Sequence, residues 1–125
     1  MERLLIMNSA VVLADGVYVA KTLTVDEARA IVKEAIKNGK EILSFVGYFE
    51  TAELMSELLD YPVVVNRAET EYRSGDMILV GKLKYRVKDP SNKGEIKPTA
   101  DDMIFILMKY CKNDDWLITH PKSGR

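Results

Sequence analysis

Two hydrophobic runs in the first half of the chain predict strands that are buried on both faces. Residues 4–13 are apolar except for Asn8 and Ser9, and residues 42–46 form a second apolar run that ends at Gly47. Runs of this length without polar alternation are typical of central strands covered on both sides. We therefore expect these two segments to lie in the middle of a sheet.

Three further segments are predicted to be strands. Residues 17–23 and 77–83 are rich in strand-forming side chains, and residues 63–65 form a short valine run after a proline. The dipeptide Asp15-Gly16 is a strong turn signal. The simplest prediction is therefore that the first strand, over 4–13, pairs with 17–23 as a hairpin.

Three segments are predicted to be helices. Thr24 and Glu27 have the spacing of a capping box, and the apolar spacing that follows continues as far as Gly39. Residues 51–59 carry apolar residues on one side and polar residues on the other, as an amphipathic helix does. Thr99 is predicted to cap a last helix, whose apolar side is formed by Met103, Ile104, Ile106, Leu107 and Tyr110.

Alternation of strands and helices predicts an α/β fold, with a single mixed sheet of about five strands flanked by helices. The strands at the hairpin and near Asp76 are expected to be antiparallel to their neighbours. Residues 1–113 are expected to form one ligand-binding domain. Residues 114–125 are expected to be a partly flexible C-terminal extension.

Composition narrows the classes of function. The 125 residues carry a net charge of −1, which argues against a binder of DNA duplexes but allows local cations around a small anion. Apolar runs are too short for a membrane span, and the first residues do not resemble a signal peptide. A single cysteine, Cys111, excludes an internal disulfide and favours a reducing interior such as the cytoplasm. The only histidine is His120, near the end, so a histidine-based metal site or catalytic triad is not expected. No cofactor is expected either.

The junction between residues 42–46 and the following helix is the first candidate site. It reads Gly47-Tyr48-Phe49-Glu50-Thr51. A helix N-terminus after a strand presents backbone N–H groups to an anion. The alternative is an ordinary strand-to-helix turn in which glycine serves only the geometry.

A second candidate is a basic stripe after the strand over 77–83. Its members alternate along the chain and would share one face of a strand: Lys82, Lys84, Arg86 and Lys88. The Arg86 guanidinium suits a phosphate, and Asp89 follows it three residues later. A solvated sheet face with a surface ion pair explains the same pattern.

Asn8 and Ser9 interrupt an otherwise apolar strand, and buried polar groups need partners. Either they mark the end of the strand, where a ligand meets the sheet, or they bond locally to a turn. The pattern leaves both alternatives open.

Taken in order, these segments resemble the viral type III anti-CRISPR ring nucleases. The resemblance spans about residues 3–110 and rests on several short motifs in the right order. They are Met7-Asn8-Ser9-Ala10, Gly16-Val17-Tyr18, Gly47-Tyr48-Phe49-Glu50-Thr51-Ala52, Asn66-Arg67, Gly75-Asp76 and the segment from Leu83 to Asp89.

The resemblance implies a small homodimer that binds cyclic tetra-adenylate across its two-fold axis. It further implies cleavage without a metal, in which a ribose 2′-hydroxyl attacks the adjacent phosphorus and the protein protonates the leaving 5′-oxygen. Two copies of a few residues could then meet all four adenylates. No membrane partner is implied.

Carried over by position, the resemblance implies catalytic roles for Tyr48, Arg86 and Asp89. It implies ligand contacts from Asn8 and Arg67. The patterns described above add Ser9, Gly47, Thr51 and Lys82 as candidate ligand contacts. Tyr48 stands where the family has its catalytic histidine, and Asp89 where it has glutamate. Since tyrosine lacks the near-neutral pKa of imidazole, we expect slow cleavage or none.

Three functions follow from that difference. The first is a ring nuclease of reduced rate, and the second is a sponge that binds cyclic oligoadenylate without cleaving it. The third is a protein that has lost the ligand because Tyr48 fills the pocket.

Overall fold

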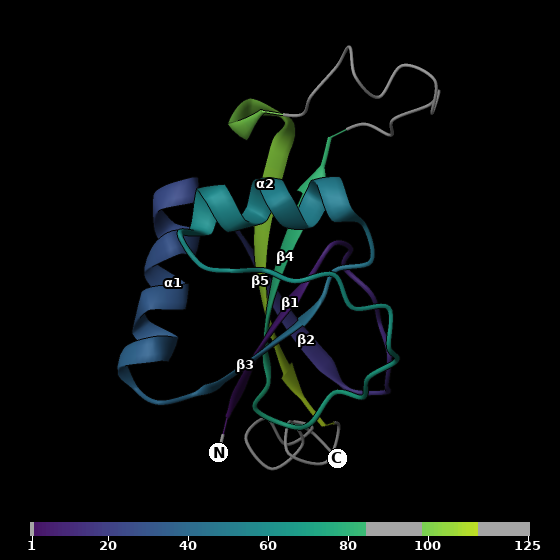
Figure 1. The fold of residues 1–125 in the computed structure, drawn as a ribbon. Helices are drawn as coiled ribbons and strands as arrows, with labels where there is room; N and C mark the ends of the chain where they lie inside the picture. Colours follow the sequence, from purple (N-terminus) through teal and green to yellow (C-terminus); the bar gives the residue numbers. More distant parts are fainter. Residues whose placement is uncertain (1, 85–98, 113–125) are drawn as a thin grey trace, which may run out of the picture.

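The computed structural model describes residues 2–84 and 99–112, which form one five-stranded mixed sheet and two helices (Figure 1). The strands are β1 (Arg3–Met7), β2 (Val17–Leu23), β3 (Glu41–Phe45), β4 (Met77–Leu83) and β5 (Met103–Cys111). The helices are α1 (Val25–Lys37), α2 (Phe49–Leu59) and the short 3₁₀ helix η2 (Ala100–Asp102). The predicted α/β class is confirmed, whereas the domain boundary at residue 113 lies outside the described ranges and stays a prediction.

β1 lies between two parallel neighbours, with the sheet order β2-β5-β4-β1-β3. All five of its residues are buried, as its apolar sequence predicts. The strand ends at Met7, however, and not at Leu13. Val12 is 75% exposed, so the second half of the apolar run leaves the sheet as a loop.

The predicted hairpin between the first two strands is wrong. β2 pairs antiparallel with β5 at one edge of the sheet, and both β5 and β4 lie between it and β1. Both edges of β1 are already hydrogen-bonded to β3 and β4, so no edge remains for β2. The strand expected over 63–65 is reduced to one parallel bridge, between Val46 and Val65.

The predicted last helix is also wrong, because its apolar residues form the strand β5. The capping box of Thr99 and Asp102 does form, but it starts only the single 3₁₀ turn η2. β5 then pairs with β4 on one edge and β2 on the other. A strand between two neighbours carries apolar residues on both faces, and the sequence alone did not separate that run from a buried helix.

Both helices cover one face of the sheet (Figure 1). α1 begins with the predicted capping box, in which Glu27 N–H donates to Thr24 Oγ1 (3.1 Å) and Thr24 N–H donates to Glu27 Oε1 (2.9 Å). The helices pack on alternate residues of the strands, including Leu4, Ile6 and Leu79. Burial of these side chains is the main stabilising contribution on this face.

Three tyrosines pack against one another on the opposite face: Tyr18, Tyr72 and Tyr110. Their hydroxyls donate to backbone carbonyls of Ala14 (2.7 Å), Val11 (2.8 Å) and Asp15 (2.6 Å), respectively. The loop over 8–16 is therefore tied down at three points where it crosses the sheet.

Candidate functional site

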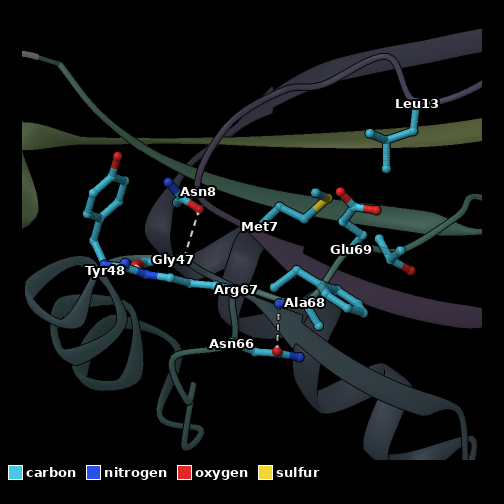
Figure 2. Close-up of a pocket in the computed structure, with 11 residues that line it drawn as sticks. Met7, Asn8, Leu13, Gly47, Tyr48, Asn66, Arg67, Ala68 and Glu69 are labelled. Carbon is cyan, nitrogen blue, oxygen red and sulfur yellow. Dashed lines mark hydrogen bonds between the residues drawn. The ribbon is translucent and has the colours of Figure 1, made fainter.

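A pocket of about 620 Å³ opens at the carboxyl ends of β1 and β3 (Figure 2). It is lined by Met7, Asn8, Leu13, Phe45, Gly47, Tyr48, Asn66, Arg67, Ala68, Glu69 and Thr70. The two parallel neighbours of β1, the strands β3 and β4, lie on opposite sides of it. Open α/β sheets bind ligands outside the carboxyl ends of their strands at such switch points.

Gly47 is held on both of its backbone groups. Its N–H donates to Asn8 Oδ1 (3.2 Å), and its carbonyl accepts from Arg67 Nε (2.9 Å). Three segments distant in the sequence are thereby joined at one residue (Figure 2). The polar interruption at Asn8 is thus explained by its position at the end of β1, beside the pocket.

Asn66 fixes the backbone from which Arg67 projects. Its Nδ2 donates to the Ser44 carbonyl (3.0 Å), and its Oδ1 accepts from the Ala68 N–H (3.0 Å). Because both ends of this amide are used internally, Asn66 serves to orient Arg67.

Donors and an aromatic ring remain available at the pocket. Within the described residues, neither the amide nitrogen of Asn8 nor the terminal nitrogens of Arg67 make a hydrogen bond. Tyr48 is the N-cap of α2 and gives no side-chain cap, so its ring is free to project, and 60% of it is exposed. The guanidinium carbon of Arg67 lies 6.0 Å from the centre of that ring, at the outer limit of a cation–π contact.

The structure brings together four of the residues predicted to form the site: Asn8, Gly47, Tyr48 and Arg67. The other three described candidates do not line the pocket. Ser9 is exposed on the loop, and Thr51 is buried in the first turn of α2. Lys82 is exposed on β4, two residues beyond Val80, which is the register partner of Met7. Arg86 and Asp89 lie outside the described residues, so their roles stay predictions.

Sequence reasoning missed part of the pocket wall. The sequence pattern predicted Met7 and Leu13 in one buried strand. Because β1 ends at Met7, Leu13 instead lies in the following loop and lines the pocket. Glu69 and Thr70 come from a polar stretch with no secondary structure, where no periodicity signals a site.

Within residues 2–84 and 99–112, no three His, Cys, Asp or Glu side chains gather as metal ligands would. No helix in these ranges has the length and apolar character needed to cross a membrane.

Comparison with protein-family models gives one match, over residues 4–105. The chain belongs to the STIV B116-like family. Every residue that lines the pocket falls within the matched range. The predicted kinship with a viral protein family is therefore confirmed in its coarser form, while ring cleavage stays a prediction.

Among solved structures, the family member B116 of Sulfolobus turreted icosahedral virus has the same fold, with a TM-score of 0.68. The alignment covers 86% of this chain and 98% of the viral protein, at 12% sequence identity. Identity this low supports a shared fold and nothing about a shared ligand. No curated protein sequence matches the chain.

Proposed function

We propose that this protein binds cyclic tetra-adenylate in the pocket at the ends of β1 and β3, inside the host cell, and thereby counters type III CRISPR signalling. The observation that supports this most is the convergence of Asn8, Tyr48 and Arg67. They come from three separate segments, and the sequence resemblance implies a ligand contact for Asn8 and Arg67 and a catalytic role for Tyr48.

The available groups suit a nucleotide phosphate. Arg67 offers its terminal N–H groups and Asn8 its amide nitrogen, while α2 begins directly after the lining residue Tyr48 and adds the positive end of its helix dipole. Glu69 lies on the other side of the pocket from Tyr48 (Figure 2) and offers carboxylate acceptors to ribose hydroxyls. A near-neutral chain can bind several phosphates in this way if a homodimer provides two copies of these donor groups.

Cleavage, where it occurs, follows an in-line displacement. The ribose 2′-hydroxyl loses its proton and its oxygen bonds to the neighbouring phosphorus, the bond from phosphorus to the 5′-oxygen breaks, and the 5′-oxygen takes up a proton. One such displacement opens the ring, and a second at the opposite phosphate gives two linear di-adenylates ending in a 2′,3′-cyclic phosphate. Since a general acid commonly contributes about 10²–10⁴-fold, a site with tyrosine in place of histidine should turn over slowly or not at all.

A sponge is the second candidate function, and the orientation of Tyr48 favours it. Figure 2 shows the hydroxyl of Tyr48 at the far end of the ring from Arg67. A proton donor should reach the leaving oxygen of a phosphate that Arg67 holds. In this arrangement the hydroxyl is directed elsewhere, whereas binding through the donors needs no proton transfer.

The test incubates purified full-length protein with radiolabelled cyclic tetra-adenylate in EDTA, read by native and by denaturing gels. A shifted band with linear product indicates a ring nuclease, and a shift with intact ligand indicates a sponge. No shift at micromolar protein would contradict the proposed function.

Arg67→Ala and Tyr48→His refine the result. Loss of the shift in Arg67→Ala places the ligand in this pocket. A gain of linear product in Tyr48→His identifies position 48 as the missing proton donor.

A further inference from the structure

We propose that Tyr48 is a base-stacking platform, which takes an adenine of the ligand on the face of its ring that Arg67 leaves open. This role rests on the proposed function and deepens it, because it assigns recognition of the base, and not proton transfer, to the residue at the catalytic position. It also predicts that the pocket selects nucleotides over bare phosphates.

Exposure of the ring is the first observation. Tyr48 is 60% exposed at the rim of the pocket, and the neighbouring Phe49 is 67% exposed. Tyr48 and Phe49 are adjacent, so they form an exposed apolar patch at the strand-to-helix junction, and such patches can mark binding sites. Aromatic faces of this kind bind nucleic acid bases in single-stranded recognition sites, because every base has a complementary face.

The position of Arg67 is the second observation. Its guanidinium carbon lies 6.0 Å from the centre of the Tyr48 ring, and its Nε donates to the Gly47 carbonyl (2.9 Å). The Gly47 N–H in turn donates to Asn8. Arg67 is therefore held on one side of the ring, which leaves the other face open to a base.

The hydroxyl gives the third observation. Within the described residues it makes no hydrogen bond, and it extends away from Arg67 (Figure 2). If the function of Tyr48 depended on its hydroxyl, that group should lie near the donors of Arg67 and Asn8 that would bind the phosphate. Here the ring face is the part of Tyr48 that lies beside Arg67, so phosphate on Arg67 and base on Tyr48 form a compatible pair of contacts.

The test measures equilibrium binding of cyclic tetra-adenylate in which one adenine is replaced by 2-aminopurine, whose fluorescence is quenched by stacking. Three variants of the full chain are compared with the wild type: Tyr48→Phe, Tyr48→Ala and Val19→Ala. The last is a control, since Val19 is also exposed but lies on β2, outside the pocket lining. Thermal unfolding of each variant checks that its fold is retained.

We expect Tyr48→Phe to bind within about twofold of the wild type and to keep the quenching. Tyr48→Ala should bind about 5- to 100-fold more weakly and lose the quenching, as removal of one stacking aromatic does elsewhere. Val19→Ala should match the wild type.

Two outcomes overturn the stacking role while the proposed function stands. In one, Tyr48→Ala binds and quenches as the wild type does. In the other, Tyr48→Phe binds as weakly as Tyr48→Ala, which would assign the contact to the hydroxyl. Failure of the wild type itself to bind contradicts the proposed function, and stacking of this ligand falls with it.

Discussion

The two ends of β1 use polar side chains in opposite ways. At its amino end, Arg3 donates to both carboxylate oxygens of Asp76 (Nε to Oδ1 at 3.1 Å, and a terminal nitrogen to Oδ2 at 2.6 Å) and to the Glu71 carbonyl (2.9 Å). Arg3 and Asp76 are only 6% and 2% exposed. At the carboxyl end, Asn8 uses only the oxygen of its side-chain amide within the described residues, and Arg67 uses one of its three side-chain nitrogens.

This contrast separates a structural polar cluster from a binding one. Both carboxylate oxygens of Asp76 are used, since Oδ2 also accepts from the Arg73 N–H (2.8 Å), and the pair of Arg3 and Asp76 closes the loop over 66–76 onto the sheet. No buried side-chain nitrogen or oxygen in the described residues lacks a partner. Unused donors are found instead at the exposed rim of the pocket, where a ligand can reach them.

The largest expected effect is at the amino end of β1, where Arg3 and Asp76 are buried as a pair. Asp76→Ala should lower the free energy of unfolding by about 3–5 kcal/mol, because it leaves the buried Arg3 guanidinium without its counter-charge. Chemical denaturation measures this. A loss below about 1 kcal/mol would show that water reaches Arg3 and that this end is not sealed.

The next largest effect is expected at the carboxyl end of β1, where the pocket lies. Arg67→Ala should weaken binding of cyclic tetra-adenylate by about 1.5–3 kcal/mol, the usual value of a hydrogen bond to a charged group. Stability should change little because Arg67 is exposed. Isothermal titration calorimetry measures the affinity, with Lys37→Ala on α1 as a control for the same loss of charge. Equal weakening in both variants would mean that only the overall charge matters.

A smaller effect is expected from Tyr72, whose hydroxyl bonds to the loop over 8–16. This loop includes Leu13 of the pocket wall. Tyr72→Phe removes the bond to the Val11 carbonyl and should cost about 1 kcal/mol of stability. Thermal unfolding near pH 7 detects this loss, and no change would mean that the hydroxyl does not restrain the loop.

The same variant carries a pH signature. Burial raises the pKa of Tyr72 from its ordinary value of 10.0 to about 12. As the pH rises from about 10 to about 12, the unfolded chain loses this proton before the folded chain does, which lowers the stability of the wild type. Tyr72→Phe lacks this loss, so the stability gap between the two proteins should narrow over that window. A gap that stays constant would contradict the raised pKa.

The smallest effect is expected at the surface ion pair between Lys40 and Glu2, whose charged atoms are 3.5 Å apart. Lys40→Gln should change the free energy of unfolding by about 0–1 kcal/mol, because exposed pairs are screened by solvent. Denaturation at low and high salt checks this. A loss as large as that of Asp76→Ala would remove the distinction between buried and surface pairs.

Local signals in the sequence predicted the parts of the fold that depend on local physics. The capping box at Thr24 starts a helix, and the glycine at Gly47 ends a strand. Strand pairing depends on which edges are already occupied, so the turn signal at Asp15-Gly16 gave the wrong partner for β2. The same limit affects β5, since burial on both faces removes the alternation that identifies a strand.

The site was predictable only where motifs carried it. Asn8, Gly47, Tyr48 and Arg67 were named because they stand in short motifs, and the structure places them around one pocket. Glu69 carried no such signal. It lines the pocket because the loop over 66–76 is closed by contacts far along the chain, including the pair of Arg3 and Asp76.

If cyclic tetra-adenylate binds at the carboxyl end of β1, the buried pair at the amino end should be unaffected. Titration of isotope-labelled protein with cyclic tetra-adenylate, followed by amide NMR, distinguishes the two ends. We expect shifts at Asn8, Gly47, Tyr48 and Arg67, with the amides of Arg3 and Asp76 unchanged. Shifts confined to another surface, or none at ligand concentrations well above that of the protein, would contradict this expectation.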